Sequence, residues 1–424
     1  MKNKENIELI PKLRFLTFPI KNWDEKKLQD IFIYLSTNTY SRNLLNNKQG
    51  IYQNIHYGDI LIKYGCIIDA QRDEIPYINE DVKCTTDNII MDGDIVMADT
   101  AEDEIVGKTS EIFNIGDKKI LSGLHTFWLR PLISFAPKYL GYFFNSTQYH
   151  NQLLPLIQGA KVSSISKKAL NNTIIVYPST SEQQKIADCL SSLDDLIEAT
   201  AQKVETLKEH KKGLMQRLFP AEGKNVPDLR FPEFQRMKGC EKKQVKDFGE
   251  VITGNTPSKK EEKYWNGDFV WVTAQDFKGK YINDSILKLT KFGKDKARVI
   301  PKNSVLVTCI ASIGLNAINK VECSTNQQIN AICCNQEYNY EYVYYLITYN
   351  TKNLKQLAGQ TAVPIITKKN FEEFEVYAIE NYDEQQKIAN CLSSLDELIE
   401  ATSRKVEILK EHKKGLMQQL FPKI

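Results

Sequence analysis

In two long segments of the chain, eight of the ten positions that follow at alternating steps of four and three are apolar. The first runs from Ile186 to Leu218, and the second runs from Ile388 to Leu420. Such steps average 3.5 residues, which is typical of coiled-coil helices whose apolar positions form one seam. Each segment is followed by Phe-Pro, which ends a helix because proline cannot donate the next backbone hydrogen bond. The predicted seam consists of Ile186, Leu190, Leu193, Ile197, Val204, Leu207, Leu214, Leu218, Ile388, Leu392, Leu395, Ile399, Val406, Leu409, Leu416 and Leu420.

The two helical segments are near copies of each other. Glu182–Pro220 and Glu384–Pro422 are identical at 33 of 39 positions, at a constant offset of 202 residues. Self-similarity of this kind indicates a duplicated unit. Ser181 and Asp383 each precede a glutamine by three positions, which is the spacing of an N-terminal capping box. A helix of about 37 residues with a rise of 1.5 Å per residue would be about 55 Å long.

A second repeated motif lies upstream of each helix. Pro11–Phe15 and Pro227–Phe231 share the pattern Pro-x-Leu-Arg-Phe. The sequence between this motif and the helix differs between the two halves, so we interpret the chain as two copies of one plan. Each copy has a variable domain followed by a near-invariant helix. The expected boundaries are 1–180 and 221–382 for the variable domains, and 181–220 and 383–424 for the helices.

Short apolar runs bounded by Gly, Asn, Asp and Pro predict β-strands in both variable domains. Two patches at 137–154 and 341–355 have the spacing of helices. We therefore expect each variable domain to be α+β, with helices on a mixed and curved β-sheet. The predicted strands are Gly58–Ile62, Gly93–Met97, Phe127–Leu129, Thr173–Tyr177, Phe269–Thr273, Ser304–Thr308, Ile329–Cys333 and Phe374–Ile379.

Charge is segregated along each helical segment. The first half of the first copy carries acidic residues such as Asp194, and its second half carries basic residues such as Lys211. Two copies packed in parallel would place like charges together, whereas antiparallel copies would place acidic halves against basic halves. Exposed ion pairs are weak, so apolar burial supplies the stability and charge selects the direction. We expect two long antiparallel helices with pseudo-twofold symmetry, which would place the variable domains at opposite ends.

Composition narrows the class of protein. The 424 residues exceed one ordinary domain, and 42% apolar with 26% charged residues is typical of globular chains. A net charge of +3 argues against nucleic-acid binding by bulk charge, but it allows a local basic face. Neither residues 1–12 nor the apolar stretch 305–318 has the length and continuity of a signal peptide or a membrane span. We expect a cytoplasmic protein with no membrane partner.

The sequence offers little catalytic chemistry of its own. Its nine cysteines lack the C-x-x-C spacing and its five histidines lack metal-site spacing, so we expect buried thiols and no metal. No Gly-x-Gly loop follows a strand in a way suited to S-adenosylmethionine, and there is neither an Asn-Pro-Pro-aromatic motif nor a phosphate-binding Gly-x4-Gly-Lys-Ser/Thr loop. We expect no catalytic residue and no cofactor.

Several loops combine basic and amide side chains with aromatic rings. Gly254–Lys260, followed by Tyr264–Asp268, is one example, and Asn326–Gln328 is another. Asn and Gln amides can pair with adenine edges, Arg and Lys with guanine, and glycine-rich loops allow backbone amides to approach phosphate. Ordinary solvated turns have the same composition, so these loops alone do not decide for DNA contact.

Taken together, these motifs resemble the specificity subunits of type I restriction–modification systems. The resemblance rests on the duplicated Glu-Gln-Gln-Lys-Ile-Ala helix that ends in Leu-Phe-Pro, and on the Pro-x-Leu-Arg-Phe motif of each half. It rests also on Gly-Asn-Thr-Pro-Ser, Tyr-Trp-Asn-Gly-Asp and Trp-Val within Gly254–Val272, and on Tyr57–Leu61 and Ser122–Thr126. The order, the duplication and the spacing of these motifs agree over nearly the whole chain.

The resemblance implies a non-catalytic, sequence-specific DNA-recognition subunit. The variable domains would be target recognition domains, each reading one half of a bipartite site in double-stranded DNA. The helices would act as a spacer and dock two copies of the methyltransferase subunit, and restriction (translocase) subunits would join in the full complex. Two alternatives stay open. One is a coiled-coil scaffold with no nucleic-acid role, and the other is a self-contained DNA methyltransferase or nuclease with an unrecognised site.

Candidate DNA contacts are polar residues in loops or at strand ends near the family motifs. For each of them, the alternative is an ordinary polar group at the surface. The candidates in the first domain are Lys63, Arg72, Thr100, Lys108, Ser110 and His125. The candidates in the second domain are Lys259, Lys260, Tyr264, Trp271, Gln275, Ser312, Gln327 and Gln328.

Overall fold

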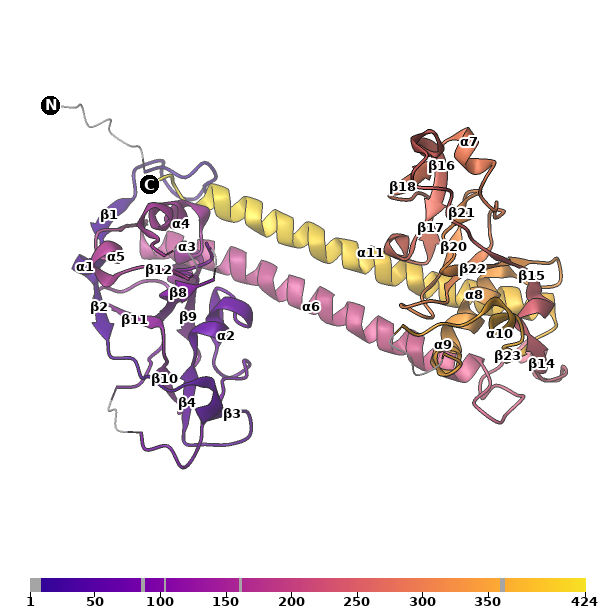
Figure 1. Ribbon diagram of the computed structural model, residues 1–424. Coiled ribbons are helices and arrows are strands. Elements are labelled where there is room, and N and C mark those ends of the chain that lie inside the picture. The colour runs from indigo at the N-terminus through magenta and orange to yellow at the C-terminus, as the bar shows by residue number, and fades with distance from the viewer. Residues whose placement is uncertain (1–8, 85–87, 103, 160–161, 359–362) are drawn as a thin grey trace. The chain divides into compact units, whose positions relative to one another are not determined.

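The computed structural model describes residues 9–84, 88–102, 104–159, 162–358 and 363–424. These residues form two compact units, unit 1 within 1–201 and 404–424, and unit 2 within 202–403. Two helices of 39 residues each, α6 (Thr180–Leu218) and α11 (Tyr382–Leu420), run from one unit into the other (Figure 1). Each unit therefore contains one variable domain together with part of both long helices.

The two long helices are antiparallel within each unit. In unit 1, Ile186 near the start of α6 shares a hydrophobic core with Leu420 at the end of α11. In unit 2, Ile388 near the start of α11 shares a core with Leu218 at the end of α6. The antiparallel arrangement expected from the charge pattern is therefore confirmed.

Equivalent ion pairs connect the helices in both units. Lys413 Nζ lies 2.5 Å from Asp194 Oδ1 in unit 1, and Lys211 Nζ lies 2.5 Å from Asp396 Oδ1 in unit 2. These positions are exchanged by the 202-residue offset of the repeat, as pseudo-twofold symmetry requires. Every residue of the predicted seam is at least partly buried. The fully buried members are Ile186, Leu190, Val204, Leu218, Ile388, Leu392, Val406 and Leu420.

The helix starts differ from the predicted capping boxes. The helices begin at Thr180 and Tyr382, so Ser181 and Asp383 lie inside the first turn. In α11 the cap is Asn381, whose Oδ1 accepts a hydrogen bond from the backbone N of Glu384 at 2.9 Å. The predicted glutamine partners instead donate along the helix, Gln184 to Asp188 and Gln386 to Asn390.

The repeated Pro-x-Leu-Arg-Phe motif binds the start of each helix. Arg14 Nη2 lies 2.6 Å from Glu182 Oε2 in unit 1, and Arg230 Nε lies 2.6 Å from Glu384 Oε1 in unit 2. Both arginine side chains are only 8% exposed. The repeated motif thus holds a glutamate in the first turn of each long helix.

The two variable domains have sheets of the same design. The main sheet of unit 1 has the order β2-β11-β7-β9-β5, and that of unit 2 has the order β15-β22-β19-β20-β17. In both sheets the first three pairings are antiparallel and the last is parallel. In unit 1 the remaining pairings form the sheet β10-β4-β6-β3 and the pairs β1-β13 and β12-β8; in unit 2 they form β18-β16-β21 and the pair β14-β23. This mixed α+β architecture confirms the predicted fold class.

The helices and strands of each unit have the following bounds, in chain order. The elements of unit 1 are β1 (Asp24–Lys27), α1 (Leu28–Ile31), β2 (Phe32–Leu35), β3 (Leu45–Asn46), β4 (Tyr52–Ile55), α2 (Tyr57–Ile62), β5 (Ile67–Asp69), β6 (Tyr77–Ile78), β7 (Ile95–Ala98), β8 (Thr100–Ala101), β9 (Thr109–Phe113), β10 (Lys119–Ser122), β11 (Thr126–Pro131), α3 (Tyr139–Phe144), α4 (Thr147–Leu153), β12 (Ser163–Ser164), α5 (Lys167–Leu170) and β13 (Ile174–Tyr177). Those of unit 2 are β14 (Glu241–Gln244), β15 (Gly249–Thr253), β16 (Trp265–Val272), β17 (Tyr281–Ile282), β18 (Leu287–Leu289), α7 (Lys291–Lys294), β19 (Val305–Thr308), β20 (Asn316–Asn319), β21 (Ser324–Thr325), β22 (Ile329–Cys334), α8 (Tyr340–Tyr349), α9 (Thr351–Gln356), α10 (Lys368–Glu372) and β23 (Glu375–Ala378).

One predicted strand is wrong. Residues 58–62 belong to helix α2, not to a strand. His56 caps this helix, because its Nδ1 accepts a hydrogen bond from the backbone N of Gly58 at 3.2 Å. Ile60 is fully buried in the core that covers one face of the main sheet, so tertiary packing overrides the β propensity of its neighbours.

The cores lie on the faces of the main sheets. In unit 1, helix α3 covers one face, and all six of its residues are buried. In unit 2, α8 covers the corresponding face with Tyr342, Tyr345 and Leu346. All nine cysteines are free thiols, and three of them are fully buried. Over the described ranges, no helix combines the length and the apolar character needed to span a bilayer.

Candidate nucleic-acid interface

Five of the predicted DNA contacts of the second domain surround one hollow in unit 2. The hollow has a volume of about 500 Å³. The predicted residues that line it are Lys259, Trp271, Gln275, Gln327 and Gln328. Thr256, Thr273, Ala274, Ile286, Leu287 and Asn326 complete its wall. We refer to this place as the amide hollow, because three glutamines and an asparagine line it.

A short 3-10 turn, Ala274–Asp276, presents Gln275 to the amide hollow. Asp276 Oδ2 accepts hydrogen bonds from the backbone N of Thr273 at 2.7 Å and from its Oγ1 at 2.9 Å. Asp276 Oδ1 accepts another from the backbone N of Ile286 at 2.9 Å. The turn is therefore fixed at both ends, while the Gln275 side chain is exposed and makes no hydrogen bond to any described residue.

The other two glutamines are partly engaged within the domain. Thr256 Oγ1 donates to Gln327 Oε1 at 2.6 Å, and Asn326 Nδ2 donates to Gln328 Oε1 at 3.2 Å. Because both amide oxygens are occupied, the NH₂ groups are left as donors. Amide donors at this place suit the acceptor atoms that purines and thymine present in the major groove.

The remaining candidates of the second domain lie in other surroundings. Trp271 forms the floor of the amide hollow; it is 2% exposed and its Nε1 donates to the carbonyl of Asn255 at 3.2 Å. Ser312 lines a separate hollow of about 490 Å³ with Lys355 and Pro364. Lys260 is exposed and Tyr264 is partly buried, and neither lines the amide hollow.

Two candidates of the first domain meet at one carboxylate. Thr100 Oγ1 donates to Asp99 Oδ1 at 2.8 Å, and His125 Nδ1 lies 3.4 Å from the same oxygen. The His125 side chain is 49% exposed, and its ring is 5.4 Å from that of Tyr57 in a T-shaped contact. The φ angle of His125 is +54°, so a left-handed residue ends the loop immediately before β11.

The other four candidates of the first domain are not gathered at this carboxylate. Ser110 is fully buried, and its Oγ donates to the carbonyl of Gly65 at 2.7 Å. Lys108 donates to the carbonyl of Leu61 at 2.9 Å, and burial lowers its pKa. Lys63 donates to the carbonyl of Glu74, whereas Arg72 is 74% exposed and lies 3.8 Å from Asp195 of α6.

Strand register identifies the counterpart of the amide hollow in unit 1. The backbone N of Asp99 donates to the carbonyl of His125, just as that of Cys309 donates to the carbonyl of Gln328. Both His125 and Gln328 immediately precede the strand at the same place in the sheet order. His125 in unit 1 therefore occupies the place of Gln328 in unit 2.

The same comparison reveals two residues that were not among the candidate DNA contacts, His56 and Tyr57, although Tyr57 begins a family motif. Both β4 and β16 pair in parallel with the strand that follows the main-sheet hairpin, and each leads into a capped turn. The caps are His56 and Thr273, each three residues before an aspartate. The spacing of three residues between cap and aspartate is visible in the sequence. That it marks equivalent places in the two domains follows only from the parallel strand pairs, which no local pattern predicts. The corresponding place in unit 1 thus carries the rings of His56, Tyr57 and His125, where unit 2 has Thr273, Ala274 and Gln328.

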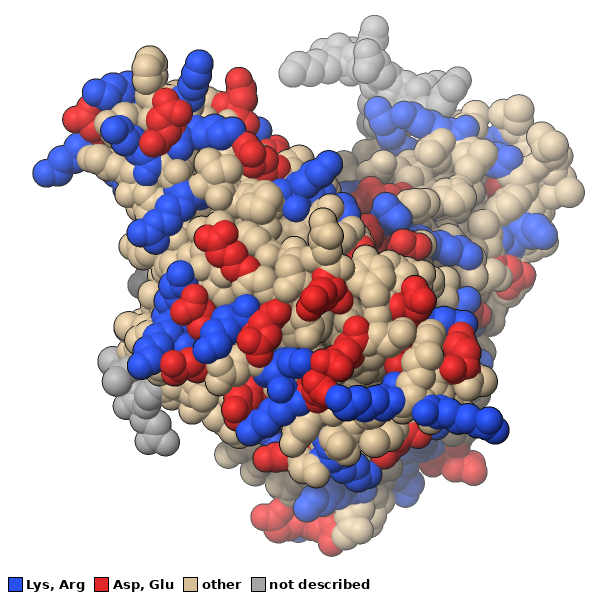
Figure 2. All heavy atoms as spheres, turned by 90° about the vertical axis from the view of Figure 1, so that its right-hand side faces the viewer, with Lys and Arg blue, Asp and Glu red and all other residues tan. Residues whose placement is uncertain are grey.

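The His56 side chain is partly buried. Burial lowers the pKa of His56, and the nearby Arg42 guanidinium adds to this effect while Asp59 opposes it. A lowered pKa favours the unprotonated Nδ1, which accepts the hydrogen bond from the backbone N of Gly58. On the face drawn in Figure 2, Lys and Arg are interspersed with Asp and Glu. Within the described ranges, no three His, Cys, Asp or Glu side chains are grouped to hold a metal ion.

Comparisons with known proteins point to one family. A family model described as the type I restriction modification DNA specificity domain matches residues 20–209 and 237–411. The MjaIX specificity subunit of Methanocaldococcus jannaschii is 35% identical over 191 residues, a match that spans 43% of this chain and 44% of that relative. The putative MjaX specificity subunit of the same organism is 25% identical over 414 residues, spanning 95% of this chain and 93% of the relative.

Solved structures share the fold at low sequence identity. The S subunit of a type I restriction–modification system from M. genitalium has a TM-score of 0.59 at 16% identity, covering 98% of this chain and all of that one. A chain from a study of assembly and conformational transition in a type I system has a TM-score of 0.58, also at 16% identity, and covers 94% of this chain and 97% of that one. The fold is thus that of these subunits, and the two matched segments, which together span most of the sequence, establish that the chain belongs to the type I restriction modification DNA specificity family.

Proposed function

We propose that this chain is the sequence-specific DNA-recognition subunit of a type I restriction–modification complex. Each variable domain reads one half of a bipartite site in double-stranded DNA. The observation that carries the proposal is one sheet design used twice with different side chains at the same place. His125 and Gln328 occupy equivalent positions, as do His56 and Thr273. Two domains with the same sheet order but different side chains at equivalent positions suit a DNA site whose two halves differ in sequence.

The helices suit a single kind of partner that is bound twice. Buried residues of a repeat are constrained by packing, but exposed residues are not. Leu196 and Leu398 occupy matching positions and are each 43% exposed. His210 and His412 also match and are exposed. Identity at exposed positions supports docking of two copies of the methyltransferase subunit, one on each copy of the repeat, with restriction (translocase) subunits joining in the full complex.

Methyl transfer is carried out by the docked subunit, and the chain described here selects the DNA sequence at which transfer occurs. A correct bidentate contact discriminates between bases by about 1–3 kcal/mol, so one hollow alone gives limited specificity. Two recognition domains joined through continuous helices make the second contact intramolecular, which adds specificity only when the spacing between half-sites is right. The helices therefore act as the spacer of the site.

The proposal is tested by selection from a randomised duplex library. The purified chain with its methyltransferase subunit should enrich two short motifs separated by a gap of constant length. The chain alone, given DNA and labelled S-adenosylmethionine, should transfer no methyl group. Transfer by the isolated chain would favour a self-contained enzyme. An unenriched library, at low salt and with the partner present, would favour a scaffold without a nucleic-acid role.

A further inference from the structure

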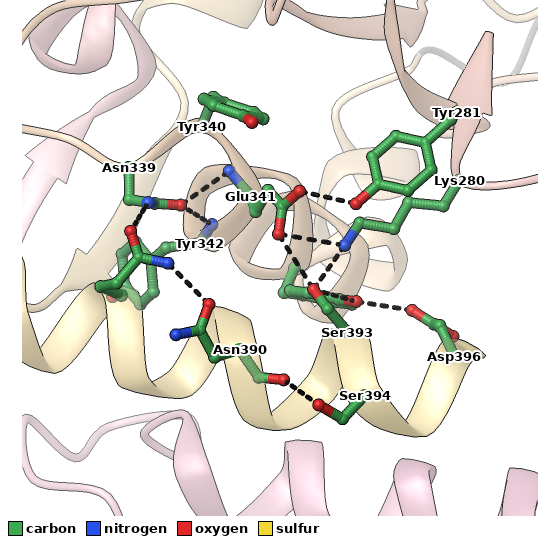
Figure 3. Close-up of polar contacts among 12 residues, drawn as sticks. Lys280, Tyr281, Asn339, Tyr340, Glu341, Tyr342, Asn390, Ser393, Ser394 and Asp396 are labelled. Carbon is green, nitrogen blue, oxygen red and sulfur yellow. Dashed lines mark hydrogen bonds and ion pairs between the residues drawn. The ribbon is translucent and has the colours of Figure 1, made fainter. Parts of the chain in front are cut away.

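A buried lysine connects the second domain to helix α11. Lys280 immediately precedes β17, the edge strand of the main sheet of unit 2, and its side chain is 8% exposed. Its Nζ donates to Ser393 Oγ of α11 at 2.6 Å and lies 3.4 Å from Glu341 Oε2 of α8 (Figure 3). One ammonium group thus connects a sheet edge, a covering helix and a long helix.

Further polar contacts close a network around this ammonium. Ser393 Oγ donates to Glu341 Oε2 at 3.0 Å, and the Tyr281 hydroxyl donates to Glu341 Oε1 at 2.6 Å (Figure 3). The Tyr345 hydroxyl donates to Asp396 Oδ2 at 2.6 Å. The rings of Tyr281 and Tyr345 each have their centroid 4.8 Å from Nζ, within the range of cation–π attraction. We call these side chains the Lys280 network: Lys280, Tyr281, Glu341, Tyr345, Ser393 and Asp396.

A buried ion pair adds little to the free energy of unfolding, so stability alone does not explain the Lys280 network. Removing an ammonium and a carboxylate from water is costly, and apolar replacements of similar size are often as stable or more stable. Burial lowers the pKa of Lys280, and the Glu341 carboxylate opposes that change. Directional contacts of this kind do favour one arrangement of the parts that they join, because each partner must lie at a fixed distance and angle.

Unit 1 has no equivalent network among its described residues. The backbone N of Glu111 donates to the carbonyl of Cys66, just as that of Ile318 donates to the carbonyl of Lys280, so Cys66 takes the place of Lys280. The backbone N of Ala136 donates to Gln183, just as that of Asn339 donates to Gln385, so Lys138 takes the place of Glu341. Only the tyrosine contact is shared, with Tyr142 bonded to Asp194.

The Lys280 network lies on the segment that carries Gln275. The turn Ala274–Asp276 lines the amide hollow, and only Phe277–Gly279 separate it from Lys280. Resting on the function proposed above, we infer that Lys280 is a positioning residue. It fixes the Gln275 segment against α11, so that the amide hollow reads its half of the DNA site in one orientation relative to the helix. The first domain does not use this device.

The test compares Lys280→Met with Lys278→Met in the full chain with its methyltransferase subunit. Lys278 lies on the same segment, is exposed and has no side-chain partner among the described residues, so this control removes an equal charge. Library selection should show that Lys280→Met lowers base preference in the second half-site by about tenfold and leaves the first half-site unchanged. The control should leave both half-sites unchanged. Equal preference in both variants, or equal loss in both half-sites, would overturn the inference.

A second variant and a second measurement keep the two proposals separable. Ser393→Ala removes the helix partner without leaving a buried cavity of any size, and it should weaken the second half-site in the same direction. Amide hydrogen exchange of residues 274–280 should be faster in Lys280→Met than in Lys278→Met, whether or not DNA is read. Unchanged exchange would overturn the positioning role. A wild-type chain that selects no bipartite site would instead overturn the proposed function.

Discussion

Glu111 lies on strand β9, and its carboxyl group contacts backbone N–H groups at the start of helix α3. Its Oε1 accepts a hydrogen bond from the backbone N of Lys138 at 2.6 Å, and its Oε2 accepts one from Gly141 at 2.8 Å. Complete burial raises the pKa of Glu111 to about 7, and the backbone donors oppose this change without cancelling it. The folded state therefore binds a proton at Glu111 more tightly than the unfolded chain does.

This difference predicts a pH-dependent stability of unit 1. The contribution of a raised pKa is fully present below the unfolded value of about 4.3 and is lost as pH rises through the folded value. Between about pH 5 and about pH 8, the wild type should lose about 3 kcal/mol relative to Glu111→Gln, measured by urea unfolding at each pH. The exposed Glu250→Gln is the matched control. An identical pH slope in wild type and Glu111→Gln would contradict the assignment.

Substitution of two side chains of the amide hollow should change DNA binding in different ways. Lys259→Ala removes a charge that suits phosphate, so binding should weaken for all sequences alike and its salt dependence should decrease. Gln275→Ala removes an unpartnered amide, so preference should relax at one base position, by about 1–3 kcal/mol. Titration of matched and mismatched duplexes at two salt concentrations separates these effects. Loss of preference at one position in Lys259→Ala would reverse the two roles.

At the scale of elements, a few ion pairs between α6 and α11 form because the two long helices are antiparallel. Lys211 and Asp396 are 17% and 25% exposed, and the ring of Tyr345 lies beside the ammonium with its centroid at 5.1 Å. A partly buried pair of this kind matters more than an exposed one, since solvent screens it less. The corresponding pair in unit 1 is formed by Lys413 and Asp194.

Reversing one of these charges should destabilise unit 2, and reversing both should restore part of the loss. We expect Lys211→Glu to lower the free energy of unfolding by about 1–3 kcal/mol, because it places two carboxylates together. The double variant Lys211→Glu with Asp396→Lys should recover about half of this. Lys208→Glu is the control, since Lys208 and Glu205 are both more than half exposed. Urea unfolding measures all three, and an additive double variant would show that the pair does not interact.

At the scale of the whole molecule, the proposed docking of one methyltransferase subunit on each copy of the repeat can be tested at exposed positions that the copies share. Leu196→Asp and Leu398→Asp change matching exposed positions, one in each copy. Either variant should reduce the number of bound methyltransferase subunits from two to one, and the double variant should bind none, as measured by mass photometry. Gln202→Asp is the control, because the copies differ there. Two bound subunits in the double variant would place the docking surface elsewhere.

The length of the helices should set the spacing of the DNA site. Insertion of one heptad into both α6 and α11, near residues 201 and 403, adds about 10.5 Å, or about three base pairs. Library selection should then recover the same half-sites with a gap about three base pairs longer, or no site at all, because the second reader also turns around the duplex. An unchanged gap would refute the spacer role.

The sequence by itself determined the repeat, the long helices, their antiparallel direction and the α+β class of the domains. These features follow from periodicity and charge, which act between neighbours along a chain or a helix face. It also named five of the eleven residues around the amide hollow as candidates, because loops with amides and aromatics are visible as motifs. The cap at Asn381 and the helix at 57–62 were missed. The helix depends on burial of Ile60 against residues of other strands, which no local pattern of residues shows.

Only the tertiary structure decided which candidates lie together. A parallel strand pair places His56 beside the loop that carries His125. Strand register shows that Gln328 is the counterpart of His125 in unit 2. It also showed that Ser110 and Lys108 are used inside the first domain, and it revealed the Lys280 network. The physical reason is that hydrogen bonding between distant strands and burial of an ion pair depend on partners far apart in the chain, which no local pattern of residues encodes.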